Sequence, residues 1–176
     1  MSILFQERKD KYNLKILIVG EGGVGKTSLS LRVYKGKFFP NLKSTIGTGI
    51  YAISYRIGND IATAAFWDFS GEDRFRMLLP PFCKGAHSAI FVYDLTRPST
   101  FSSFPEWRDL VFQNTGYGSI PIIIVGNKAD LPDAHKPLPG TNYVTSAKTG
   151  LNAYEAFGHA VKLAYMEAKK RYGKTK

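Results

Sequence analysis

The chain has 176 residues and a mass of 19.6 kDa, a length that fits one domain, since domains usually run to about 100–200 residues. Its composition, 44% hydrophobic and 22% charged, supplies a core and excludes a disordered chain. The net charge of +10 gathers mainly at the two ends without a nucleic-acid-binding motif, and no apolar run reaches the ~18–20 residues that span a bilayer.

Short, nearly continuous apolar runs predict strands that are buried on both faces of a parallel sheet. The strands expected on this pattern are residues 14–19, 88–93 and 120–125, with a short strand at 142–145. Residues 50–57 and 61–67 flank the turn Gly58-Asn59-Asp60 and predict an antiparallel hairpin.

Helices are predicted in the longer connections. Residues 28–34 continue from a glycine-rich loop, and residues 99–113 carry apolar side chains at helical spacing. In the last helix, Asn152 and Glu155 match a capping box at its start. The sequence therefore predicts a single α/β domain whose sheet is mostly parallel.

A phosphate-binding loop is predicted between the first strand and the first helix. Residues 20–27 read Gly-Glu-Gly-Gly-Val-Gly-Lys-Thr and match the pattern G-x-x-x-x-G-K-[ST]. Glycines let backbone N–H groups surround a phosphate, Lys26 would meet the β- and γ-phosphates, and the Thr27 hydroxyl would bind Mg²⁺. The phosphate-binding residues expected here are Gly22, Gly23, Val24, Gly25, Lys26, Thr27 and Ser28.

Two more motifs each follow a predicted strand: Asn127-Lys128-Ala129-Asp130 and Ser146-Ala147-Lys148. With the phosphate loop, they resemble the N-K-x-D and S-A-K motifs of Ras-like small GTPases, and residues 67–68, 74–76, 84–87 and 92–96 look most like the Rab branch. The resemblance covers roughly residues 14–170. It implies a P-loop NTPase fold with a sheet of about six strands flanked by helices. We expect one GTP-binding domain over residues 1–176, with flexible ends at 1–12 and 172–176.

Guanine recognition is expected at Asp130. A carboxylate accepts hydrogen bonds from both N1–H and the exocyclic amine of guanine, and adenine lacks that pair of donors. By resemblance, Asn127 joins this motif to the phosphate loop, Lys128 covers the base, the Ala147 N–H meets the guanine oxygen, and Phe38 stacks against the base. The ligands expected are GTP and GDP.

A metal site and two switch segments are predicted next. Asp68 opens a D-x-x-G motif, so its carboxylate would hold Mg²⁺ and the Gly71 N–H would contact the γ-phosphate. Thr45 matches the threonine that completes the metal shell only with GTP bound. The metal ligands expected are Thr27, Thr45 and Asp68, and loss of the γ-phosphate would release both segments.

Glu72 departs from the family, which usually has a glutamine that orients the attacking water. An ionised glutamate accepts hydrogen bonds but donates none, and it repels a γ-phosphate. We therefore expect slow GTP hydrolysis, with Lys26, Thr45, Gly71 and Glu72 as the catalytic residues. The alternative is a GTP-bound scaffold that binds partners and hardly hydrolyses.

The remaining expectations concern partners and location. Effectors, exchange factors and GTPase-activating proteins would bind the switches and the hairpin, where Ile50, Trp67 and Phe82 stand at the family's effector positions; burial in the sheet is the alternative for these three. Residues 131–145 hold three prolines, which predicts a loop where relatives have a helix. The single Cys83 and the polar start predict a cytoplasmic protein, and a monomer is expected. The chain lacks the terminal cysteines of prenylated relatives, so either the protein is not lipid-anchored or a tail follows residue 176. The basic terminal helix predicts weak electrostatic membrane contact at most.

Overall fold

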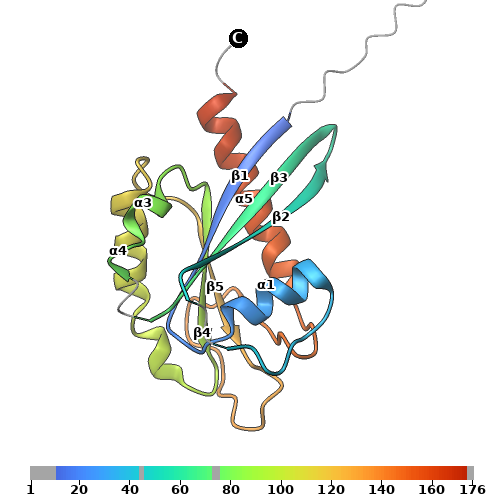
Figure 1. Ribbon diagram of the computed structural model, residues 1–176, viewed down its shortest axis with the longest axis vertical. Helices are drawn as coiled ribbons and strands as arrows, with labels where there is room; N and C mark the ends of the chain where they lie inside the picture. The colour runs from blue at the N-terminus through green and yellow to red at the C-terminus, as the bar shows by residue number, and fades with distance from the viewer. Residues whose placement is uncertain (1–10, 44–45, 73–75, 174–176) are drawn as a thin grey trace, which may run out of the picture.

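The computed structural model describes residues 11–43, 46–72 and 76–173. Within these ranges a six-stranded sheet has the strand order β2-β3-β1-β4-β5-β6 (Figure 1). Only the pair β2 and β3 is antiparallel among the strand pairs of these ranges, so the expected mostly parallel sheet with one hairpin is confirmed. The strands are β1 (Lys11–Val19), β2 (Thr48–Ile57), β3 (Asp60–Phe69), β4 (Ser88–Asp94), β5 (Ile122–Asn127) and β6 (Tyr143–Val144).

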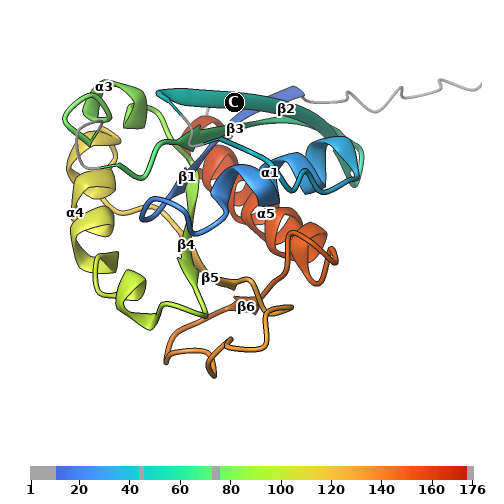
Figure 2. The same cartoon turned by 60° about the horizontal axis from the view of Figure 1, so that its bottom comes forward.

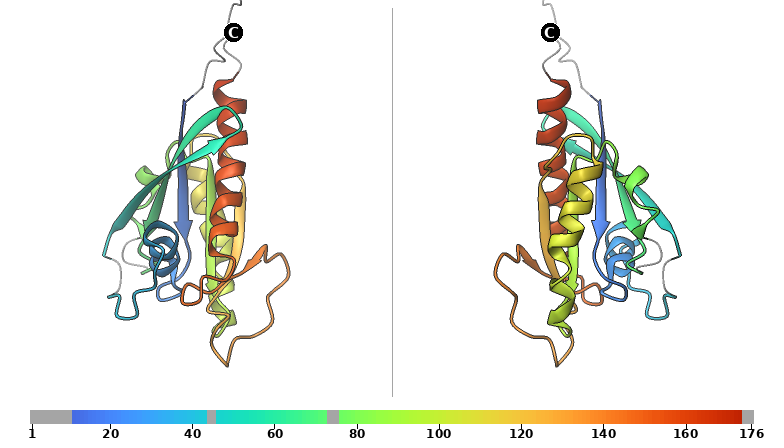
Figure 3. Two further views of the ribbon diagram at one scale, coloured as in Figure 1. Left: turned by 90° about the vertical axis from the view of Figure 1, so that its right-hand side faces the viewer. Right: turned by 90° about the vertical axis from the view of Figure 1, so that its left-hand side faces the viewer.

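Helices cover both faces of the sheet. Helix α1 (Lys26–Lys35) and α5 (Ala153–Tyr172) lie on one face, and α3 (Pro80–Cys83) and α4 (Phe104–Asn114) lie on the other (Figure 2). The long α5 runs beside the sheet over much of the height of the molecule (Figure 3). None of the helices in the described ranges has the length and apolar character needed to cross a membrane.

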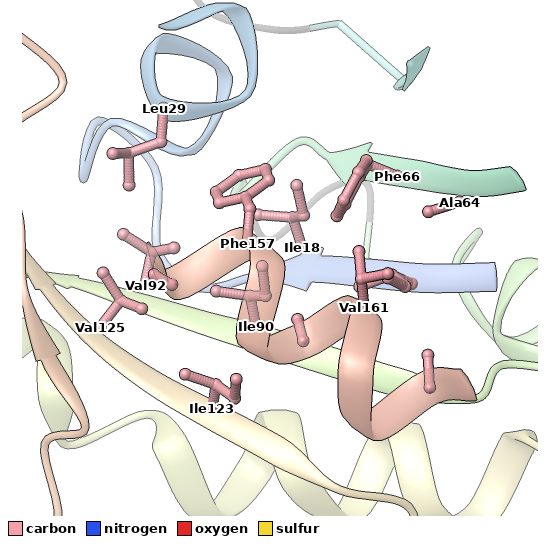
Figure 4. Packing of buried hydrophobic residues seen from close by; sticks show 14 of the residues in the cluster. Ile18, Leu29, Ala64, Phe66, Ile90, Val92, Ile123, Val125, Phe157 and Val161 are labelled. Carbon is pink, nitrogen blue, oxygen red and sulfur yellow. The ribbon is translucent and has the colours of Figure 1, made fainter. Parts of the chain in front are cut away.

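The alternation of side chains along β1 builds a core on each face. Ile16 and Ile18 pack on the α5 side, whereas Leu17 packs on the α4 side with Trp107. Figure 4 shows Ile18, Phe66, Ile90 and Phe157 converging from the sheet and α5. Burial of each such side chain stabilises the fold by about 1.5–3 kcal/mol, so the two cores hold the site loops on a rigid base.

Two helix predictions need correction. The helix expected over residues 99–113 is split into the 3₁₀ helix η1 (Pro98–Phe101) and α4, because a proline occupies the first turn of each. The capping box at the start of α5 is wrong: Asn152 has φ of 49° and makes no side-chain cap, and its Nδ2 donates to Val144 O at 2.9 Å.

The loop between β5 and β6 contains no helix over residues 128–142, as its three prolines predict. The Tyr93 hydroxyl fastens this loop to β4, since it accepts a hydrogen bond from Leu138 N at 3.0 Å and lies 2.8 Å from Thr141 Oγ1. Asn142 continues the attachment by accepting from Ile124 N at 2.7 Å. The loop, rather than a helix, therefore covers this edge of the sheet.

Buried His87, the residue before β4, makes fold stability depend on pH. Its Nδ1 accepts a hydrogen bond from Lys15 N at 3.0 Å, and burial, aided by the Arg171 charge, lowers its pKa from 6.5 to about 4. Below pH 6.5 the unfolded chain therefore binds the extra proton, so the free energy of unfolding falls as pH falls, by about 2 kcal/mol between pH 7 and pH 5. The variant His87→Asn keeps an acceptor for Lys15 N–H but does not titrate. We expect its free energy of unfolding, measured with urea, to fall much less between pH 7 and pH 5. Equal losses in the two proteins would contradict this assignment.

Candidate functional site

The candidate site lies where the parallel strands end at their carboxyl termini, at the lower end of the molecule in Figure 1. The loop after β1 leads into α1, Asp68 stands near the end of β3, and Asn127 ends β5. Strands far apart in sequence therefore bring the expected motifs to one edge of the sheet.

A cavity of about 350 Å³ opens beside the phosphate loop. Of the residues predicted as functional, Gly22, Gly23, Gly25, Lys26, Thr27, Ser28, Phe38, Gly71, Glu72 and Lys128 line it. Seven others, Val24, Asp68, Asn127, Asp130, Ser146, Ala147 and Lys148, do not line it, and Thr45 lies outside the described residues. The cavity thus contains the phosphate end of the expected site together with Phe38 and Lys128, two of the residues expected beside the base.

The phosphate loop has a tightly constrained backbone. Gly25 has φ of 99°, and a Cβ there would lie 2.3 Å from Asn127 Nδ2, so only glycine fits. Lys26 Nζ spans the loop and donates to Gly20 O at 2.9 Å and Glu21 O at 2.7 Å. Burial lowers the pKa of Lys26 to about 8, although the Asp68 and Glu21 charges act in the opposite direction. A phosphate beside this ammonium would stabilise its charged form and raise the pKa again, so the loop suits an anion.

Thr27 and Asp68 form a pair that fits a hard cation. Thr27 Oγ1 donates to Asp68 Oδ2 at 2.5 Å, while buried Asp68 Oδ1 has no hydrogen-bond partner among the described residues. Burial raises the pKa of Asp68 to about 6, although the Thr27 hydrogen bond and the Lys26 charge lower it. A divalent cation would satisfy the orphan oxygen and favour the ionised carboxylate. The described residues contain no cluster of three or more His, Cys, Asp or Glu for a metal, so phosphate oxygens would have to complete such a shell.

Asn127 joins the base-reading motif to the phosphate loop, as the resemblance implies. Its Nδ2 donates to Val24 O at 3.0 Å, and its Oδ1 accepts from Thr145 Oγ1 at 3.1 Å and from Ala147 N at 3.3 Å. One buried side chain therefore fixes three loops relative to one another. The Ala147 N–H, expected to meet guanine, here bonds to Asn127.

Asp130, which is expected to recognise guanine, accepts a hydrogen bond at its Oδ1 from Ser146 Oγ at 2.6 Å. The remaining acceptor positions of the carboxylate stay available for the two donors of guanine. Arg32 on α1 anchors the same loop, because its Nε donates to Ala147 O at 2.8 Å and its Nη2 donates to Lys148 O. Sequence reasoning missed Arg32, which no motif marks.

The described part of the second switch contacts the phosphate loop closely. A Cβ at Gly71 would lie 2.2 Å from the carbonyl carbon of Glu21, so this approach also requires glycine. Glu72 lines the cavity, with its Cγ 4.0 Å from where a Cβ of Gly22 would be. Arg76, which the sequence marked only as part of a Rab-like stretch, forms ion pairs with Glu21 at 2.6 Å and with Glu106 at 2.9 Å, contacts that connect this switch to the phosphate loop and to α4.

The expected partner surface is partly exposed. Ile50 is 54% exposed and Phe82 39%, while Trp67 is half-buried with its ring 6.0 Å from that of Phe82. Ile50 and Trp67 are paired across β2 and β3. The three side chains therefore lie together beside the second switch, and none of them is fully buried in the core.

Comparison with known proteins agrees with this geometry. The family model described as Ras family matches residues 15–170. The chain is 35% identical to the Ras-related protein Rab-22A of Mus musculus over 156 residues, which is 82% of this chain and 79% of that protein. It is 31% identical to the Ypt/Rab-type GTPase ypt7 of Schizosaccharomyces pombe over 172 residues, which is 89% of this chain and 84% of that protein. It is 40% identical to the Ras-related protein Rab-18-B of Danio rerio over 117 residues, which is 66% of this chain and 57% of that protein. The chain therefore belongs to the Ras family of small GTPases and is most similar to its Rab branch.

Proposed function

We propose that this GTPase is a molecular switch that binds GTP and GDP together with Mg²⁺ and hydrolyses GTP slowly to GDP and phosphate. It would act as one guanine-nucleotide-binding domain and as a monomer in the cytoplasm, a reducing compartment with which the single free Cys83 is consistent. The observation that carries the proposal is the Asn127 bridge to Val24, because it couples a base-reading loop to a phosphate loop.

Each site residue has a defined task in this proposal. The Lys26 ammonium and the loop N–H groups would bind the β- and γ-phosphates, and Asp130 would select guanine. Thr27 and Asp68, with Thr45 from the first switch, would hold Mg²⁺, which neutralises phosphate charge when bound. Gly71 would contact the γ-phosphate, so loss of the γ-phosphate on hydrolysis would release the second switch.

Glu72 supports a second candidate, a GTP-bound scaffold with little hydrolysis. A carboxylate in the cavity wall cannot donate a hydrogen bond to the phosphate and repels its charge. Multiple-turnover release of phosphate distinguishes the two: steady turnover favours the switch, and release of less than one equivalent favours the scaffold. Either form would present Ile50, Trp67 and Phe82 to effectors, exchange factors or GTPase-activating proteins.

Chelation of the metal tests the proposed site. We expect EDTA to speed release of a fluorescent GDP by about ten- to hundredfold, since one charge-assisted contact is worth ~1.5–3 kcal/mol. Thr27→Ala should release GDP quickly with or without EDTA, because its hydroxyl would no longer hold the metal. Thr63→Ala is the control, since Thr63 lies on β3 with its hydroxyl 3.3 Å from Ser54. No saturable preference of the parent for GDP over ADP would overturn the proposal.

A further inference from the structure

The peptide units of the phosphate loop are held from outside the cavity by side chains. Asn127 holds the Val24 carbonyl, and Arg97 Nη2 donates to the Gly22 carbonyl at 3.2 Å. In a trans peptide the C=O and the next N–H point in opposite directions. A donor on the Gly22 carbonyl therefore fixes the N–H of Gly23 on the opposite side of that peptide.

Arg97 is itself anchored by a buried carboxylate at the end of β4. Its Nε lies 3.1 Å from Asp94 Oδ2, and the Asp94 side chain is 0% exposed. The backbone turn that follows β4 is fixed as well, because Arg97 N donates to Asp94 O at 2.9 Å and Thr100 Oγ1 donates to Arg97 O at 2.7 Å. The guanidinium thus has little freedom to leave the loop.

The same carboxylate is shared with the base-reading motif. Lys128 Nζ lies 2.7 Å from Asp94 Oδ2, and Thr96 donates through N and Oγ1 to Asp94 Oδ1 at 2.9 and 2.7 Å. Burial alone would raise the pKa of Asp94, but the hydrogen bonds from Lys128, Thr96 and Arg97 outweigh it and hold the pKa below its usual value. Two cations, Arg97 and Lys128, therefore share the one carboxylate of Asp94, so this cluster of three side chains carries an excess of positive charge.

We propose that Arg97 is a positioning residue of the phosphate loop, held by Asp94, that orients the Gly22–Gly23 peptide toward the nucleotide phosphates. It would act on that peptide as Asn127 acts on the Val24–Gly25 peptide. A hydrogen bond to the carbonyl also polarises the peptide and strengthens its N–H as a donor. The inference rests on the proposed function, because it presupposes a phosphate in the cavity.

The test compares GDP release and the state of the bound phosphates. Arg97→Ala should release GDP about tenfold faster than the parent, which corresponds to ~1.4 kcal/mol. The modest size follows from the 49% exposure of the Arg97 side chain, where solvent weakens the contact. The ³¹P resonance of the β-phosphate of bound GDP should shift in Arg97→Ala and move back toward the parent position in Arg97→Lys, which keeps a cation near Asp94. Arg108→Ala is the control, since Arg108 is exposed on α4 and pairs with Asp109 at 2.8 Å.

The outcomes separate this inference from the function on which it rests. If the parent binds no GDP, the proposed function and the inference both fail. If the parent binds GDP and Arg97→Ala matches it in release rate and ³¹P position, only the inference fails. Faster release with an unchanged ³¹P resonance and a lower melting temperature of the nucleotide-free protein would also overturn it, since Arg97 would then merely stabilise the fold.

Discussion

Asp130→Asn is expected to weaken GTP binding by about 10³- to 10⁴-fold and to improve binding of xanthosine triphosphate. The carboxylate, held by Ser146 Oγ at 2.6 Å, would accept both N1–H and the exocyclic amine of guanine. An asparagine offers one acceptor and one donor, so its NH₂ would face the guanine amine and leave both unpaired. Xanthine carries a carbonyl at that position, which the asparagine NH₂ satisfies. Competition of each triphosphate against fluorescent GDP measures both affinities.

Asp133→Asn provides a matched control for this experiment. Asp133 lies three residues further along, in the exposed loop between β5 and β6, and the substitution changes the net charge equally. It should leave the preference for guanine as in the parent. An Asp130→Asn protein that binds GTP as tightly as the parent would refute the role of Asp130 in base recognition.

The parts of the site that could be predicted are those that short, contiguous sequence motifs encode. The phosphate loop needs glycines at fixed offsets, so its pattern identifies Lys26 and Thr27 before any fold is known. The parallel-strand pattern then brings Asp68 and Asn127 to the same sheet edge. The helix-free segment after Asp130 was equally predictable, because three prolines spaced along a short segment cannot all lie in the first turn of a helix, and a proline in the helix interior breaks it.

The parts that escaped prediction depend on tertiary contacts. Arg32 reaches the Ala147 carbonyl across 115 residues of sequence and Arg97 reaches Gly22 across 75, and neither arginine belongs to a motif. The capping box failed for a related reason, since Asn152 adopts a left-handed conformation and donates to Val144 instead of capping α5. Local patterns therefore identified the groups proposed to meet the nucleotide, whereas the groups that hold them in place depend on the whole fold.

Glu72→Gln is expected to raise the rate of GTP hydrolysis by about ten- to hundredfold. Glu72 lines the cavity beside Gly22, so its carboxylate would face the γ-phosphate. Two like charges at ~4 Å repel by about 4 kcal/mol at an effective dielectric of about 20, and partial exposure reduces this to roughly 1–3 kcal/mol. Glutamine removes the charge, and its amide both donates and accepts, as orientation of a water requires.

Single-turnover hydrolysis of bound GTP isolates this effect from nucleotide exchange, because substrate is already in place. GTP affinity should change less than the rate, since the advantage of glutamine arises as water attacks and charge moves on the phosphate. Glu155→Gln on α5 makes the same chemical change at an exposed position far along the chain and should leave the rate unaltered. If Glu72→Gln hydrolyses bound GTP no faster than the parent, the carboxylate imposes no handicap, and the slow turnover proposed for this GTPase would need another cause.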